Sequence, residues 1–343
     1  MKKVFVMMVA VLVFLVVPLS SSKNIIFAQT INSKESIQTS PYDLVSSKGE
    51  IIRFKDYSKL IDTKIKASKP IIGTGQVLPE RDLKKNPNKP TIDLGTGIAV
   101  RDKEPGTIST QVVLGTDGRQ KVSDTSISPY RQIAYIELEY GNSYAMCTGT
   151  VIGYDYVLTN AHCVRDLETN TRANGGYVIP ALTDNHYSYG AYEIENFYYP
   201  NGYDQTGGAS QYDYAVIKLA PYYGYEIGEV VGALAFREVT TDLTDTYIKI
   251  FGYPGDKIIS TGLYNQWGMS GNVTMDLENI LYYTIDTAPG QSGSAILDSS
   301  NQVVGVHNAG YDFSGDDIAD INGGPKMTSE MSSFIRMAAL LGG

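Results

Sequence analysis

The stretch YTIDTAPGQSGSA, residues 283–295, decides how the rest of the sequence is interpreted. An apolar, β-prone run leads into a tight turn in which Gly290 and Gly293 flank Ser292. Glycine lets the backbone adopt conformations that a side chain forbids, so this turn can aim two N–H groups at one point beside a serine hydroxyl. Acyl transfer needs that arrangement of nucleophile and oxyanion hole. An ordinary Gly/Ser turn between two strands is the alternative, and the surrounding chain must decide.

Composition favours an all-β fold. The chain has 343 residues, of which 43% are hydrophobic, a fraction typical of globular proteins. Tyrosine (26 residues) and glycine (34 residues) are abundant, while long helical patterns are scarce. This combination predicts many short strands joined by turns.

The N-terminus has the pattern of an export signal. Two lysines precede an unbroken apolar run from Val4 to Val17, which is short for a bilayer span and suits the core of a signal peptide. We therefore predict a signal peptide over residues 1–28 and a secreted, extracellular protein. Cleavage after Ala28 is preferred, with residues 20–22 as an alternative site. An uncleaved membrane anchor is the competing interpretation.

Charge separates the next segment from the rest of the chain. Residues 24–111 carry a net charge of +4, whereas residues 112–343 carry −16. A basic segment before an acidic domain predicts a removable pro-segment over residues 29–111 that docks by charge complementarity. A solvated linker is the alternative, and residues 81–90 do resemble one. Val112 opens the acidic domain either as an edge strand or as a new N-terminus made by processing.

Cys147 and Cys163 are the two cysteines of the sequence. In an exported chain they predict a disulfide that closes a modest loop and holds the segment carrying His162. A metal site is the alternative, but two cysteines and one adjacent histidine lack a plausible fourth ligand.

The three histidines differ in their surroundings. His186 lies in a polar stretch and is predicted to be a surface residue, while His162 ends a predicted strand beside Cys163. Further along, Asp213 lies two residues before the apolar run AVIKL, residues 215–219. Taken singly, His162 could be structural and Asp213 could cap a strand. A partly buried aspartate can also orient a histidine and stabilise its imidazolium.

The chain order His162, Asp213, Ser292 resembles that of the chymotrypsin-like serine peptidases. The resemblance rests on the motifs TNAHC (159–163), YDYAV (212–216) and GQSGS (290–294). Within that class the sequence is most similar to the secreted glutamyl endopeptidases of bacilli and staphylococci. The likeness runs over most of residues 112–327, including GYPGDK from residue 252 and NGGPK from residue 322.

The resemblance implies a chymotrypsin-like fold for a peptidase domain over residues 112–343. Two six-stranded antiparallel β-barrels are expected, the first over about residues 131–235 and the second over about residues 245–327. A short helix over about residues 329–341 is predicted from apolar residues at helical spacing and is expected to pack on the second barrel. These residues are Met331, Phe334, Ile335, Ala338 and Leu341.

The resemblance also implies the catalytic roles. Ser292 is the expected nucleophile, His162 the general base and acid, and Asp213 the residue that orients His162. The backbone N–H groups of Gly290 and Ser292 form the expected oxyanion hole. Gln291 replaces the aspartate that precedes the nucleophile in the digestive branch of the class, so the activation switch of that branch is absent in its usual form.

A pocket for a glutamate side chain is implied in the same way. Its expected donors are the His307 imidazole, the Thr287 hydroxyl and the α-amino group of Val112 after processing. Asn308, Ala309 and Gly310 are expected to pair with the substrate backbone as an added strand.

No cofactor is expected to be required. The loop over residues 311–320 is rich in carboxylates and could bind a structural calcium ion, with a solvated acidic loop as the alternative. Expected partners are the chain's own pro-segment and protein or peptide substrates with Glu at the cleaved position. We expect a monomer, without nucleic acid and without membrane contact after signal cleavage. Rival interpretations are a serine peptidase of other specificity and a catalytically inactive binding module on the same fold.

Overall fold

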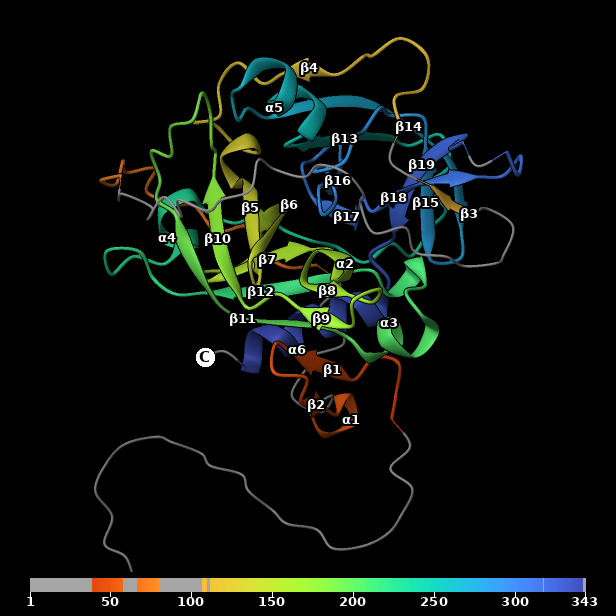
Figure 1. Ribbon diagram of the computed structural model, residues 1–343, viewed down its shortest axis with the longest axis horizontal. Coiled ribbons are helices and arrows are strands. Elements are labelled where there is room, and N and C mark those ends of the chain that lie inside the picture. Colours follow the sequence, from red (N-terminus) through yellow and green to blue (C-terminus); the bar gives the residue numbers. More distant parts are fainter. Residues whose placement is uncertain (1–38, 58–66, 81–106, 110–111, 317, 342–343) are drawn as a thin grey trace, which may run out of the picture. The chain divides into compact units, whose positions relative to one another are not determined.

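A computed structural model of the chain describes residues 39–57, 67–80, 107–109, 112–316 and 318–341 (Figure 1). The predicted signal peptide lies outside these residues, as does part of the predicted pro-segment, including the lysine-rich stretch 81–90. Among the residues described, no helix is both long enough and apolar enough to cross a bilayer.

Six antiparallel strands form a closed barrel in the first half of the peptidase domain. They are β5 (Ile133–Tyr140), β6 (Ser143–Val151), β7 (Tyr156–Thr159), β10 (Gly175–Pro180), β11 (Tyr192–Pro200) and β12 (Ala215–Leu219). Their order is β10-β5-β6-β7-β12-β11, and pairing of Val178 with Tyr192 joins the two ends. Alternate residues such as Ile136 and Leu138 fill the interior and are fully buried. The predicted first barrel is confirmed.

The second half forms a half-barrel. Its strands are β13 (Tyr247–Gly252), β14 (Trp267–Leu277), β15 (Ile280–Tyr283), β16 (Ala295–Asp298), β17 (Val303–Val306), β18 (Ala309–Asp312) and β19 (Ile321–Pro325). The order is β17-β16-β13-β14-β15-β19-β18, and a single bridge between Gly305 and Lys326 connects the first strand to the end of β19. A Cβ on Gly324 would lie 1.8 Å from the Val306 carbonyl oxygen. Among the described residues the second sheet therefore closes through that one bridge, and not through the full strand pairing expected of a six-stranded barrel.

Parts of the predicted pro-segment are built into both sheets. The segment β1 (Leu44–Ser46) pairs with β11 and with β2 (Ile51–Ile52), and extends the first sheet. The segment β3 (Thr107–Ser109) pairs with β18 at the edge of the second sheet. Between them, the backbones of Ile71 and Ala233 exchange two hydrogen bonds of 3.0 and 2.9 Å. The described parts of the N-terminal segment thus contact the peptidase domain at several separate places.

The remaining elements are short, apart from the C-terminal helix. They are α1 (Phe54–Tyr57), β4 (Gln120–Lys121), η2 (Tyr130–Gln132), α2 (Ala161–Val164), β8 (Arg165–Asp166), β9 (Thr171–Arg172), α3 (Asn201–Thr206), η3 (Ser210–Tyr212), α4 (Ile227–Val231), α5 (Gly255–Thr261) and α6 (Ser329–Leu341). The helix α6 begins and ends where the apolar spacing predicted.

The helix α6 was expected to pack on the second barrel alone, and the structure shows that it packs against both barrels. Phe334 of α6 is fully buried and contacts the ring of Tyr214 edge-on, with 5.1 Å between ring centroids. Its cluster includes Leu158 and Val216 from the first barrel as well as Val306 from the half-barrel. The apolar stripe of α6 therefore packs against both sheets, which places the helix below β11 and β12 in Figure 1.

Candidate active site

His162 lies on the short helix α2, directly after β7. The strand ends at Thr159, Asn160 is extended, and the helix begins at Ala161. The Asn160 amide donates to the backbone carbonyl of Asp213 at 2.7 Å. His162 was predicted at the end of the strand, and the structure places it three residues beyond, as the second residue of α2.

Asp213 is 1% exposed and is bonded to His162 twice. Its Oδ1 accepts from the backbone N–H of His162 at 2.9 Å, and its Oδ2 lies 2.7 Å from the ring Nδ1. The side chain of Asn308 adds a third hydrogen bond to Oδ2 at 3.1 Å. An ionised carboxylate can only accept, so Nδ1 carries the proton and Nε2 of the neutral ring is left as a base.

The loop between β15 and β16 carries Ser292 against the first barrel. Gly290 and Gly293 both have positive φ, +98° and +87°. A Cβ on Gly293 would lie 2.0 Å from the Thr148 carbonyl oxygen and 2.2 Å from Oγ1 of Thr159. The backbone N–H of Thr148 also donates to the carbonyl of Ser292 at 2.8 Å. The serine loop is thereby seated on β6 and on the end of β7, the strand that leads to His162.

The three predicted catalytic residues belong to one connected group. Gly293 donates its N–H to the carbonyl of His307 at 2.9 Å, and the next residue, Asn308, bonds the Asp213 carboxylate. Asn308 is itself held by the Tyr311 hydroxyl at 2.9 Å. The structure therefore brings the His162–Asp213 pair and the serine loop to the junction of the two sheets.

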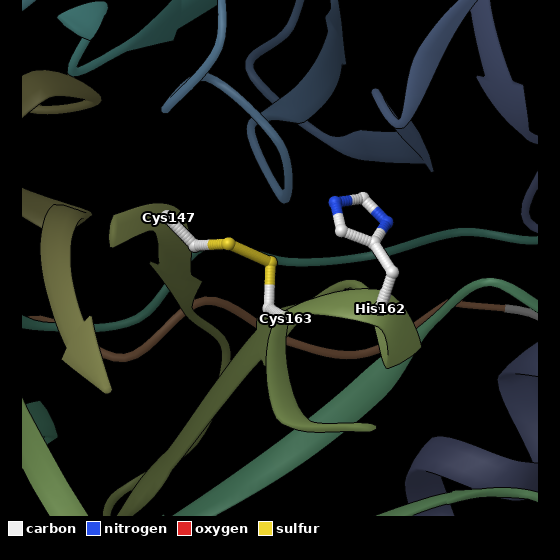
Figure 2. A group of neighbouring side chains, drawn as sticks. All are labelled: Cys147, His162 and Cys163. Atoms are coloured by element: carbon white, nitrogen blue, oxygen red, sulfur yellow. A yellow bond between two sulfur atoms is a disulfide. The ribbon is translucent and has the colours of Figure 1, made fainter. Parts of the chain in front are cut away.

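The predicted disulfide is present. Cys147 on β6 and Cys163 on α2 are bridged across a sequence separation of 16 residues. Figure 2 shows the bridge beside the His162 ring. One ring nitrogen of His162 and the two sulfur atoms lie within 4.8 Å of one another. Because both sulfurs are bonded to each other, neither is a thiolate, and these residues do not fit a metal site.

Val112 and Thr287 lie side by side. The backbone N–H of Thr287 donates to the Val112 carbonyl at 3.2 Å. Asn322 bonds Val112 from the other side, because its amide donates to the same carbonyl at 2.8 Å and its Oδ1 accepts from the Val112 N–H at 3.3 Å. A new N-terminus at Val112 would therefore begin next to Thr287.

His307 and Thr287 each have a buried polar atom with no hydrogen-bond partner in the described part of the chain. These atoms are Nε2 of His307 and Oγ1 of Thr287, and both residues are 0% exposed. A buried polar group of this kind calls for a partner. Burial lowers the pKa of His307 to about 3, against a smaller opposing effect of its hydrogen bond with the Gly323 carbonyl. The imidazole is therefore neutral at neutral pH.

The predicted substrate-pairing residues 308–310 lie at the start of β18. The Asn308 N–H donates to the Gly323 carbonyl, and Ala309 and Gly310 pair with Gly323 and Asn322 of β19. On the opposite edge, Gly310 pairs with Ser109 of β3. A segment of the predicted pro-segment thus lies along the strand that is expected to receive substrate.

The acidic loop uses several of its carboxylates internally. Asp312 accepts from the N–H of Gly315 at 2.6 Å, and Asp320 accepts from the N–H groups of Phe313 and Ser314 at 2.8 Å each. These bonds account for two of its carboxylates as turn-forming groups, and calcium binding stays an untested prediction. His186 has a side chain that is 72% exposed, so its predicted surface position is confirmed.

Sequence reasoning missed three residues that hold this site. Arg119 is buried and bonds both Gln291 and Asp256, Asn322 holds Val112, and Tyr283 bonds His307. The sequence offered only weak signals for them. Arg119 follows a Gly/Asp turn. Tyr283 and Asn322 lie within stretches quoted in the sequence analysis, but no role was assigned to either residue.

Comparison with known proteins identifies the family. A family model described as a trypsin-like peptidase domain matches residues 147–306. The glutamyl endopeptidase of Bacillus licheniformis is 33% identical over 236 residues, which cover 68% of this chain and 65% of that protein. A solved structure of a Glu endopeptidase in complex with MPD is 48% identical with a TM-score of 0.61, and the match covers 67% of this chain and 100% of that chain. The chain belongs to the glutamyl endopeptidase family of trypsin-like serine peptidases.

Two more distant proteins also match the chain. A glutamyl endopeptidase of Staphylococcus aureus is 28% identical over 200 residues, which cover 58% of this chain and 52% of that protein. The chain thus spans between about half and about two thirds of the length of these two curated glutamyl endopeptidases. The protease Anisep from Arthrobacter nicotinovorans, at 22% identity and a TM-score of 0.54, shares the fold.

Proposed function

We propose that this chain is a secreted serine endopeptidase that hydrolyses peptide bonds after Glu, and less readily after Asp. His162, Asp213 and Ser292 form its catalytic triad. The observation that carries the proposal is the pair of hydrogen bonds from His162 to Asp213, next to a glycine-flanked serine, in a member of this family. This arrangement supplies a base with a fixed tautomer beside a candidate nucleophile.

The reaction proceeds by acyl transfer. Oγ of Ser292 attacks the backbone carbonyl carbon of the Glu residue, and Nε2 of His162 takes the hydroxyl proton. The imidazolium, stabilised by Asp213, then gives its proton to the leaving amine as the peptide C–N bond breaks. Water attacks the acyl-enzyme in the same way and restores Ser292. The N–H groups of Gly290 and Ser292 stabilise the oxyanion, each by roughly 3 kcal/mol by analogy with measured cases.

Glu preference comes from the buried polar atoms at the pocket. Nε2 of His307 and Oγ1 of Thr287 supply hydrogen bonds to the substrate carboxylate. Cleavage before Val112 adds an ammonium group beside Thr287, since Thr287 already bonds the Val112 carbonyl. The negative carboxylate of a Glu side chain is then bound by one positive charge and two neutral donors. The neutral amide of a Gln side chain would interact less favourably with the positive charge.

The proposed function includes synthesis of the chain as an inactive precursor. Pairing of β3 with β18 supports this, because it occupies Gly310 while the Val112 N–H is still part of a peptide bond. Both the substrate edge and the pocket charge would become available only after processing. N-terminal sequencing of the secreted protein tests the boundary at Val112.

The central test uses a nucleophile variant and a peptide panel. Ser292→Ala should abolish turnover and labelling by an organophosphonate while the protein stays folded. Ser299→Ala, an exposed serine at the turn after β16, is the matched control and should leave both unchanged. Peptides that differ only in Glu, Asp, Gln or Lys at the cleaved position should rank with Glu first. Retained cleavage by Ser292→Ala would refute the catalytic assignment, and equal rates across the panel would refute the specificity.

A further inference from the structure

Tyr283, the last residue of β15, contacts the proposed pocket histidine, His307, at its Nδ1 side. Its hydroxyl lies 2.8 Å from Nδ1 of His307, and both side chains are 0% exposed. The carbonyl oxygen of Gly323 also lies 3.1 Å from the same Nδ1. Nε2, the other ring nitrogen, is the atom without a partner among the described residues.

The two groups on Nδ1 favour opposite tautomers of a neutral ring. A carbonyl oxygen can only accept, so Gly323 favours the proton on Nδ1 and leaves Nε2 bare. A phenol hydroxyl can donate, so Tyr283 favours a bare Nδ1 and places the proton on Nε2. Only the second tautomer donates a hydrogen bond to a carboxylate in the pocket. A bare Nε2 would repel the carboxylate and accept instead from the N–H₂ group of a Gln side chain.

We infer that the Tyr283 hydroxyl donates to Nδ1 of His307 and thereby selects the tautomer that discriminates Glu from Gln. The inference rests on the proposed function, because it assigns His307 to the specificity pocket. Tyr283 is a positioning residue in this scheme, since it acts on the substrate through His307. The shorter of the two contacts to Nδ1 is the one from Tyr283, as the inference requires.

Burial keeps both partners in the protonation state that this scheme needs. It lowers the pKa of His307 to about 3, so the ring has one N–H and a choice of tautomer at neutral pH. It also raises the pKa of Tyr283 well above its usual value, so the phenol keeps the proton that it donates. With both groups neutral, the hydrogen-bond partners of Nδ1 decide which nitrogen bears the proton.

Tyr283→Phe removes the donor and keeps the ring. The Gly323 carbonyl then remains as the partner of Nδ1, and Nε2 loses its proton. We expect kcat/KM for a Glu peptide to fall by about tenfold or more, and kcat/KM for the matched Gln peptide to rise. Tyr282→Phe is the matched control, because Tyr282 precedes Tyr283 on β15 and packs against Tyr311 and Phe313. It should keep the wild-type ratio of the two rates.

The tautomer can also be read directly, without turnover. In ¹⁵N-histidine-labelled protein carrying Ser292→Ala, the buried His307 should show a protonated Nε2, and adding Tyr283→Phe should move the proton to Nδ1. The chain has three histidines, so the spectrum can be assigned by single substitutions.

The outcomes separate the inference from the proposed function. A wild-type enzyme with no preference for Glu over Gln would refute the proposed specificity, and the inference with it. A wild-type Glu preference that Tyr283→Phe leaves within about twofold would overturn the inference alone. If Tyr283→Phe does not fold, the wild-type spectrum decides, because a proton on Nδ1 of His307 contradicts the inference.

Discussion

Arg119 donates a hydrogen bond from Nη1 to Oε1 of Gln291, the residue before Ser292, over 3.3 Å. The same Oε1 accepts from the backbone N–H of Ala288 at 3.1 Å. Gln291 is fully buried, so its amide links the serine loop to the segment that follows Val112. In the digestive branch, the new N-terminal ammonium pairs with the residue before the nucleophile. Here the guanidinium of Arg119, which lies within the chain, contacts the residue at that position before any cleavage at Val112.

Removing the Arg119 side chain should loosen this link. The guanidinium is 0% exposed and bonds Asp117 and Asp256, which are 29% and 46% exposed. Arg119→Met leaves Asp256 without this cation, whereas Asp117 keeps Lys257 at 2.7 Å, and water can reach both carboxylates. We expect the free energy of unfolding to fall by about 2 kcal/mol, measured by urea denaturation, and kcat to fall more than KM rises.

An ion pair on the same segment is the control for Arg119. Lys121 pairs with Asp184 at 2.9 Å, but the two side chains are 41% and 53% exposed. Lys121→Met should cost less than about 0.5 kcal/mol, as exposed pairs do. Equal losses for the two variants would show that burial of Arg119 does not matter.

Gly293→Ala should disrupt the seat of the serine loop. The added Cβ would meet backbone and side-chain atoms of the first barrel at 2.0 and 2.2 Å, and φ is +87°. We expect a loss of about 4 kcal/mol or more in unfolding free energy, together with loss of activity. Gly262→Ala isolates the backbone cost, because Gly262 has φ +69° and no heavy atom within 4 Å of an added Cβ. That control should lose about 1 kcal/mol, and a similar loss at Gly293 would contradict the close contact.

His307 should make stability depend on pH below neutrality. Its folded-state pKa of about 3 lies below the unfolded value of 6.5, so the unfolded chain binds more protons between these values. The stabilisation is complete above pH 6.5 and is lost as the pH falls towards 3. In the Ser292→Ala background, adding His307→Gln should reduce the loss of unfolding free energy between about pH 7.5 and about pH 5 by roughly 2 kcal/mol. An unchanged loss of unfolding free energy over this pH range would contradict the prediction.

The disulfide should stabilise the region of His162. A bridge across 16 residues contributes about 3 kcal/mol on the loop-entropy model. Replacing both Cys147 and Cys163 with alanine should lower the unfolding free energy by that amount, and kcat should fall because α2 carries His162. Unmodified protein unfolded under a reducing agent is the reference and should show the same loss. A double variant as stable as the oxidised wild type would contradict this prediction.

The sequence by itself determined the fold class and the candidate catalytic residues. Apolar spacing predicted α6, because the pattern is local and repeats along one element. The motifs around His162, Asp213 and Ser292 could be recognised because each is a short contiguous stretch with a characteristic order. The cysteine pair was predictable for a similar reason, since two cysteines in an exported chain leave one pairing.

Only the tertiary structure decided how these pieces support one another. Arg119 meets Gln291 across 172 residues of sequence, and Tyr283 meets His307 across a half-barrel, and neither pairing leaves a periodic or contiguous signal. The incomplete closure of the second sheet and the packing of α6 against both sheets depend on contacts between elements far apart in the sequence, which composition does not encode. Hydrogen bonds and burial act through space, so the residues that hold the site emerged only once the chain was folded.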